Sequence, residues 1–103
     1  MKRAVISITT VVALLSMGHA AAADEGKATY DKVCAVCHAK GIVGAPKLGD
    51  KSLWEPRMKK GGADALTASV IAGKGVMAPR AGVASLSDAD IKAAVDYMIN
   101  QVK

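Results

Sequence analysis

Two cysteines three positions apart, followed directly by a histidine, are the feature that most restricts how this 103-residue chain can fold. In Cys34-Ala35-Val36-Cys37-His38 the thiols lie one helical turn apart and the imidazole follows at once. Covalent attachment of a haem needs this spacing, because each sulfur forms a thioether to one vinyl-derived carbon and the histidine lies beneath the iron. We therefore predict one haem c per chain, thioether-linked through Cys34 and Cys37, with His38 as proximal ligand.

A disulfide or a redox-active thiol pair is the alternative for these two cysteines. A thioredoxin-like pair lies at a strand-to-helix junction of a βαβ unit. This chain shows no convincing alternation of apolar and polar residues and is too short for that fold. The sequence therefore favours haem attachment.

The N-terminus has the composition of a secretory signal peptide. Its second and third residues are basic, an uncharged run over 4–17 follows, and small residues come next. An uncleaved membrane anchor is the alternative, but the run is shorter than the roughly 20 apolar residues of a membrane span. We predict a signal peptide over 1–23, cleaved after Ala20 or Ala23, export to a bacterial periplasm, and a single mature domain over 24–103.

Residues 24–103 offer little apolar material for a core. They contain no Phe, and their only aromatic residues are Tyr30, Trp54 and Tyr97. A domain of this size buries only about 60% of its unfolded surface, so a large apolar haem would supply the missing interior. Removal of two basic residues leaves 12 against 9 acidic ones, a net charge of +3 without a basic cluster. Nothing specific supports nucleic-acid binding.

The apolar periodicity predicts an all-α chain without repeats or a second domain. We expect a first helix from about residue 25 through 33 into the haem motif, a short helix whose capping box begins at Ser52, and a third helix over 63–72. Ser87 is the expected N-cap of the last helix. The apolar face of that helix comprises Ile91, Ala94, Val95, Met98, Ile99 and Val102.

Together these residues resemble the monohaem class I cytochromes c, and within them the bacterial cytochrome c5 group. The similarity covers essentially the whole mature chain. It is carried by Gly26 with Tyr30 and Tyr97, the Cys34–His38 motif, Gly44-Ala45-Pro46-Lys47-Leu48-Gly49-Asp50, Trp54-Glu55-Pro56-Arg57, residues 75–82 and Leu86-Ser87-Asp88-Ala89-Asp90-Ile91. The resemblance implies a small fold of about four helices around one haem, and a soluble one-electron carrier rather than an enzyme.

The sixth iron ligand is predicted to be a methionine, because cleavage removes His19 and leaves no histidine besides His38. Met98 belongs to the apolar face of the last helix, and Met58 lies in the short helix, where a packing role is expected. Met77 lies in a loop between glycines, next to a proline. We predict His38 and Met77 as the two metal ligands.

Two departures from the c5 group concern the loop of Met77. Ala78 replaces the first proline of the usual Met-Pro-Pro, and the two cysteines that some relatives carry are absent at 83–87. A looser loop leaves open an alternative function, ligand binding or peroxidase-like chemistry at an iron that Met77 releases. A peroxidase would also need a distal acid or base, and no second histidine remains for that role.

The resemblance also assigns residues around the ligands. It implies that the Pro46 carbonyl accepts a hydrogen bond from His38. The indole N–H of Trp54 and the charge of Arg57 are candidates for binding the haem propionates. A packed Trp54 and a solvated Arg57 are equally compatible with the sequence.

Expected partners are redox proteins that act as electron donor and acceptor, a membrane-bound reductase or oxidase among them. Lys40, Lys47, Lys74 and Arg80 flank the predicted haem loops and would form a basic rim for an acidic partner. The alternative is that these residues only keep a small protein soluble. We expect no membrane span in the mature chain, and a monomer or a weak dimer.

Overall fold

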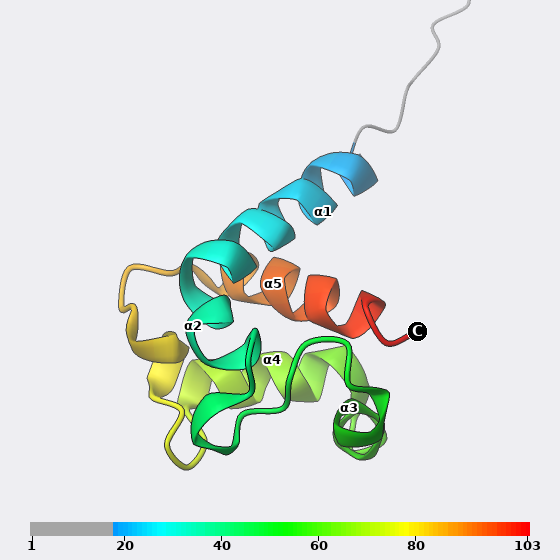
Figure 1. The fold of residues 1–103 in the computed structure, drawn as a ribbon. Coiled ribbons are helices and arrows are strands. Elements are labelled where there is room, and N and C mark those ends of the chain that lie inside the picture. Colours follow the sequence, from blue (N-terminus) through cyan, green and yellow to red (C-terminus); the bar gives the residue numbers. More distant parts are fainter. Residues whose placement is uncertain (1–17) are drawn as a thin grey trace, which may run out of the picture.

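Helices make up nearly all the regular structure of residues 18–103, the part of the chain that the computed structural model describes (Figure 1). Those residues contain no strand, only one isolated antiparallel bridge. The elements are α1 (Gly18–Thr29), η1 (Tyr30–Cys34, a π-helix), α2 (Ala35–His38), η2 (Ile42–Gly44), α3 (Lys51–Met58), α4 (Gly62–Ala72), η3 (Pro79–Gly82) and α5 (Asp88–Asn100). Because α1, η1 and α2 follow one another without a break, the chain forms four main helical units. The predicted all-α fold of about four helices is confirmed.

The N-terminal helical unit is longer than predicted. It begins at Gly18 instead of about Glu25. As predicted, it runs on into the haem motif, through η1 and α2 to His38. Most of the predicted signal peptide, residues 1–17, lies outside the described residues. In the described part, no helix is long and apolar enough to cross a membrane.

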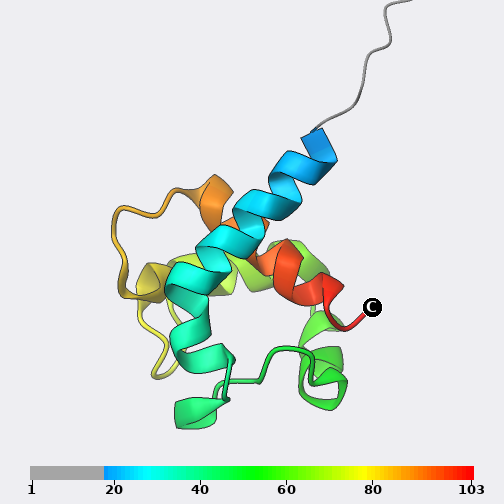
Figure 2. The ribbon, with the colours of Figure 1, turned by 45° about the horizontal axis from the view of Figure 1, so that its top comes forward.

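The crossing of α1 and α5 is the most extensive helix contact in the described chain (Figure 2). Gly26 makes it possible, because a Cβ at this position would overlap the Ala93 carbonyl oxygen of α5 and lie 2.8 Å from its carbon. The rings of Tyr30 and Tyr97 pack beside the crossing, with centroids 5.3 Å apart. The resemblance to the c5 group rested in part on these same three residues.

Helix α3 begins one position earlier than its predicted cap. Ser52 was expected to cap it, but the N-cap is Asp50, whose carboxylate accepts from the Leu53 N–H at 3.3 Å. The hydroxyl of Ser52 donates to the same carboxylate at 2.6 Å, and this bond lowers the pKa of Asp50. A carboxylate two positions upstream can accept both donors, so the serine becomes a donor rather than the cap. Pro56 therefore lies in the second turn, not the first.

Helix α5 follows the prediction closely and provides one wall of the interior. Ser87 forms a capping box with Asp90, and all six residues of the predicted apolar face are buried. One buried cluster joins Tyr30 and Trp54 to Met98 and Val102. A second cluster packs Ile91, Val95 and Ile99 against α4 residues Ala63, Leu66, Val70 and Ile71.

Candidate cofactor site

All seven predicted site residues line a single cavity of about 430 Å³. Its lining residues belong to α2, the segment over 41–50, α3, α4 and α5, among other segments. Figure 2 shows how these helices are arranged. The predicted residues are Cys34, Cys37, His38, Pro46, Trp54, Arg57 and Met77. Apolar side chains complete the lining, among them Leu66, Val70, Leu86, Ile91, Val95 and Met98. An apolar cavity with two thiols and an imidazole at its wall fits a covalently held haem.

The histidine of the motif is held in one orientation. His38 is 8% exposed, and its Nδ1 lies 2.8 Å from the Pro46 carbonyl oxygen, to which it can donate. The hydrogen bond that the resemblance implied is therefore present. The Leu48 amide donates to the His38 carbonyl at 2.8 Å. The segment over 46–48 is therefore hydrogen-bonded to both the side chain and the backbone of His38. A donating Nδ1–H leaves Nε2 as the nitrogen with a free lone pair for a metal.

The surroundings of Cys34 do not suit a redox-active cysteine. Cys34 and Cys37 are half-buried free thiols and no disulfide joins them. Burial raises the pKa of Cys34 to about 11. A redox-active cysteine needs a lowered pKa, because the thiolate is the reacting species. The thioredoxin-like alternative is therefore disfavoured by the environment of Cys34.

Trp54 and Arg57 each donate a hydrogen bond to a backbone carbonyl of the protein. The indole N–H of Trp54 donates to the Lys47 carbonyl at 2.9 Å, and its buried ring lies 5.8 Å from the His38 ring. This arrangement supports the packed alternative for Trp54 over the propionate role. Arg57 donates through Nη1 to Leu53 O at 2.6 Å while lining the cavity, so its other nitrogens remain for a propionate.

Sequence reasoning missed Lys60 as a second cation at this wall of the cavity. Lys60 follows Arg57 by three positions, and both line the cavity. Residues three apart share one side of a helical turn, so the spacing was a usable signal once Arg57 was singled out.

Of the three candidate methionines, Met58 does not line the cavity and packs instead against both buried clusters. Met98 lines it from α5 but is 5% exposed and belongs to the core, as predicted. Met77 lines it from the loop over 73–82.

Backbone hydrogen bonds and close contacts shape the loop over 73–82, although Ala78 stands where the c5 group has a proline. The amide of Lys74 donates to Met77 O at 2.9 Å, and the amide of Met77 donates to Lys74 O at 3.0 Å. A tight turn through Gly75, with φ of 57°, closes this bridge. Gly73 abuts Pro79, since an added Cβ would lie 2.8 Å from the proline nitrogen. The backbone of Met77 is thus hydrogen-bonded on both sides without the missing proline.

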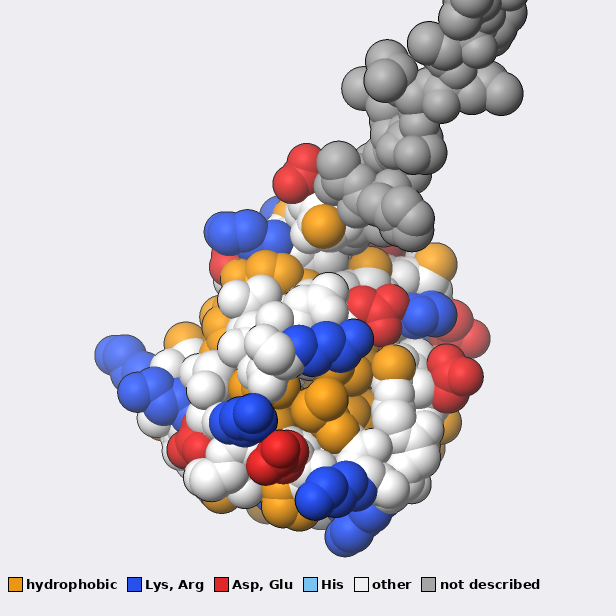
Figure 3. All heavy atoms as spheres, turned by 90° about the vertical axis from the view of Figure 1, so that its right-hand side faces the viewer, with side chains coloured by type: hydrophobic (Ala, Val, Ile, Leu, Met, Phe, Trp, Pro, Cys, Tyr) orange, Lys and Arg blue, Asp and Glu red, His pale blue; other side chains and the backbone are white. Residues whose placement is uncertain are grey.

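The predicted basic rim is reduced from four residues to three. Lys40, Lys47 and Lys74 are exposed, but Arg80 is engaged with Leu86 and Asp88 and is not free for a partner. On the face seen in Figure 3, basic and acidic side chains alternate around apolar ones. That face therefore carries both signs of charge.

Comparison with known proteins gives consistent matches. Residues 21–98 match the family model described as cytochrome c oxidase, cbb3-type, subunit III. A cytochrome c-555 of Chlorobaculum tepidum is 45% identical over 109 residues, covering 100% of both chains. A cytochrome c5 of Azotobacter vinelandii is 39% identical over 77 residues, covering 74% of this chain and 93% of its own.

A solved structure is also similar. It is described as the crystal structure of an electron transfer complex of nitrite reductase with cytochrome c. The matching chain has a TM-score of 0.72 and 48% identity, and the match covers 77% of this chain and 95% of that one. Sequence and structure comparisons thus agree on the kind of protein.

Proposed function

The chain belongs to the monohaem class I c-type cytochromes of the c5 group, and we propose that it carries single electrons in the bacterial periplasm with His38 and Met77 as axial ligands. Electron transfer through haem c is the function of this family. The observation that carries the ligand assignment is the convergence of His38, with Nδ1 committed to Pro46, and Met77 on one cavity.

The protein's own residues hold and shield the cofactor. The S–H bond of each of Cys34 and Cys37 adds across one vinyl C=C, with sulfur on one carbon and hydrogen on the other, so no atom is lost. Pro46 orients His38, and the apolar lining excludes water. When bound, the haem supplies a one-electron Fe(III)/Fe(II) couple.

Ligation by Met77 accounts for carrier function rather than catalysis. A thioether favours ferrous iron and raises the reduction potential. An iron held by both His38 and Met77 would have no position open to a substrate. The two backbone hydrogen bonds at Met77 support this assignment over the ligand-binding or peroxidase-like alternative.

Export and redox partners are part of this proposal, and two of the similar proteins support it. The c5 relative and the similar crystallised chain each match about three quarters of this chain, and each match covers nearly the whole of that protein. These lengths fit the proposed removal of an N-terminal segment. The partner in that crystal structure is a nitrite reductase. We propose that this chain likewise exchanges electrons with redox proteins, a membrane-bound reductase or oxidase among them.

The ferric absorption spectrum of the matured protein tests the ligand assignment. A low-spin haem with methionine ligation has a weak far-red charge-transfer band. We expect this band in the wild type, its loss in Met77→Ala, and its retention in the matched control Met58→Leu, whose methionine does not line the cavity. A high-spin wild type without the band would contradict His/Met ligation and favour an open iron.

A further inference from the structure

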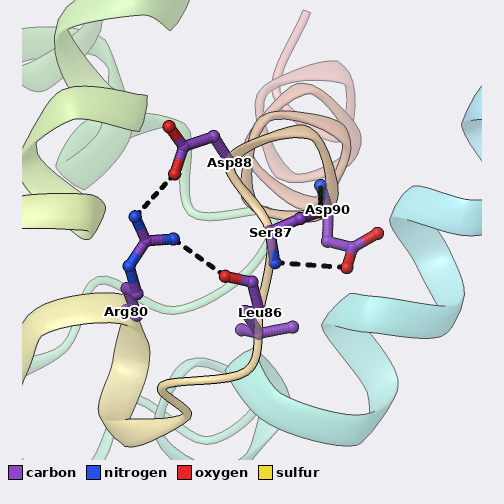
Figure 4. Close-up of polar contacts among 5 residues, drawn as sticks. All are labelled: Arg80, Leu86, Ser87, Asp88 and Asp90. Atoms are coloured by element: carbon purple, nitrogen blue, oxygen red, sulfur yellow. Dashed lines mark hydrogen bonds and ion pairs between the residues drawn. The ribbon is translucent and has the colours of Figure 1, made fainter.

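One side chain, Arg80, ties the Met77 loop to the start of α5 (Figure 4). Its Nη1 donates to Leu86 O at 2.8 Å, and its Nη2 lies 2.7 Å from Asp88 Oδ1. Leu86 precedes the N-cap of α5, and Asp88 is its first residue. We call these two contacts the Arg80 clasp. We propose that Arg80 is a positioning residue that keeps the Met77 thioether at the iron, an inference that rests on the proposed ligand role of Met77.

The other hydrogen bonds of this loop in the described chain are local. Each joins backbone groups three residues apart, within the pairs 74–77, 78–81, 80–83 and 83–86. Such bonds shape the loop but do not fasten it to the remainder of the protein. Among residues 18–103, the hydrogen bond and ion pair that do so both belong to Arg80.

The backbone under the clasp is strained. Arg80 and Ala81 have φ of 54° and 53°, the left-handed region that residues with a Cβ disfavour. Consecutive residues keep such a conformation only where their surroundings enforce it. The planar guanidinium fork, bonded at two of its nitrogens, fixes the direction of the Arg80 side chain and thereby restrains this backbone.

The clasp joins two segments that both line the cavity. Met77 and Ala81 line the cavity from the loop, and Leu86 lines it from the segment before α5. The Leu86 side chain also packs against the buried cluster of Ile91, Val95 and Ile99. Arg80 therefore bonds to the carbonyl of a residue whose side chain is packed in the core. This hydrogen bond joins the Met77 loop to the segment before α5.

The two contacts of the clasp should differ in strength. Asp88 is 69% exposed at its side chain and Arg80 is 31% exposed, so solvent and salt screen their ion pair. The bond from the charged guanidinium to a part-buried carbonyl is the stronger contact. Loss of Arg80 removes both contacts, whereas loss of the Asp88 charge removes only the weaker one.

Release of the loop would lower the effective concentration of the thioether at the iron. Added imidazole would then replace Met77 more readily, with the Fe–S bond breaking as an Fe–N bond forms and no change in oxidation state. We expect ferric holoprotein of Arg80→Ala to bind imidazole about tenfold more tightly than the wild type, the effect of losing one charge-assisted hydrogen bond. Titration of the far-red band measures this affinity.

Three further variants separate positioning from general stability. Asp88→Asn should change imidazole affinity about twofold, because an exposed ion pair contributes little. Arg80→Lys should recover part of the loss, since one ammonium cannot reproduce the fork. The control Lys92→Ala removes the Lys92–Asp96 pair of 2.9 Å, which lies on α5 away from the loop, and should leave imidazole affinity unchanged.

The outcomes of this experiment are distinguishable. Absence of the far-red band in the wild type overturns the ligand role of Met77 itself. A wild type with the band, and with an imidazole affinity equal to that of Arg80→Ala, overturns the clasp. An equal rise in Lys92→Ala also overturns it, because the effect would then be global. Should Arg80→Ala not incorporate haem, Arg80→Lys carries the test, and an affinity equal to that of the wild type counts against the proposal.

Discussion

At the scale of single residues, Tyr30 combines a packed ring with an unpartnered hydroxyl. The residue is 4% exposed, and its hydroxyl finds no hydrogen-bond partner among the described residues. A buried polar group without a partner loses its bonds to water and gains none in return. Burial is also the main reason that the pKa of Tyr30 lies above its ordinary value of 10.0, followed by the charge of Tyr97.

We therefore predict that Tyr30→Phe stabilises the holoprotein by about 1 kcal/mol at neutral pH, because the ring remains and the unpaired hydroxyl is gone. The raised pKa adds a pH dependence. Above pH 10.0 the unfolded tyrosine loses its proton before the folded one, so folded-state stability falls as pH rises through this range. Guanidinium unfolding at pH 7 and 11 should show a smaller alkaline loss for Tyr30→Phe. A destabilised variant at neutral pH would instead indicate a hidden partner for the hydroxyl.

At the scale of helices, the contact between α1 and α5 depends on the missing side chain of Gly26. A Cβ there would overlap the Ala93 carbonyl oxygen, and it would lie 3.2 Å from the Cβ of Tyr97. Both neighbours belong to or project from the backbone of α5, so they cannot move without shifting the helix.

We predict that Gly26→Ala lowers the free energy of unfolding by about 3 kcal/mol, the upper range for overpacking a tight site. Helix propensity alone would act in the opposite direction, since alanine is about 1 kcal/mol better than glycine within a helix. The sign of the change therefore identifies which effect dominates. Guanidinium unfolding of the holoprotein measures it, and a stabilised variant would mean that the two helices do not approach this closely.

How well each element was predicted depends on how local its determinants are. The capping box of α5 and its apolar spacing lie within the helix itself, and both were predicted from the sequence. The start of α3 was misplaced because Asp50 and Ser52 are both good caps, and the choice depends on the direction in which the chain arrives from the Pro46 loop. The π-helix at η1 has no sequence signal that we could recognise.

The same distinction applies to the site. The motif cysteines, His38 and Met77 were predicted from residue type and spacing, and the structure brings them to one cavity. The resemblance supplied the Pro46 carbonyl as the partner of His38, but the backbone partners of other side chains were not predictable. Trp54 bonds to Lys47 O and Arg80 to Leu86 O because tertiary packing brings those carbonyls near, and neither pairing leaves a pattern in the sequence.

At the scale of the whole molecule, the interior is incomplete without a cofactor. The cavity of about 430 Å³ separates walls contributed by every main helical unit. Its lining is mostly apolar, with Leu66, Val70 and Val95 among its residues, so a haem bound there would bury apolar surface that the helices do not cover by themselves. The polypeptide alone should therefore be unable to maintain this arrangement of helices.

We predict that the double variant Cys34→Ala, Cys37→Ala, prepared without haem, is largely unfolded at 25 °C, while the wild-type holoprotein unfolds cooperatively on heating. Far-ultraviolet circular dichroism followed through a thermal scan measures both. The residual helix signal should be low and should change gradually with temperature, because the α1–α5 crossing alone buries too little apolar surface to sustain a cooperative fold. A sharp transition in the colourless variant would contradict this prediction. It would mean that the helices pack cooperatively by themselves and that the fold does not need the haem as part of its core.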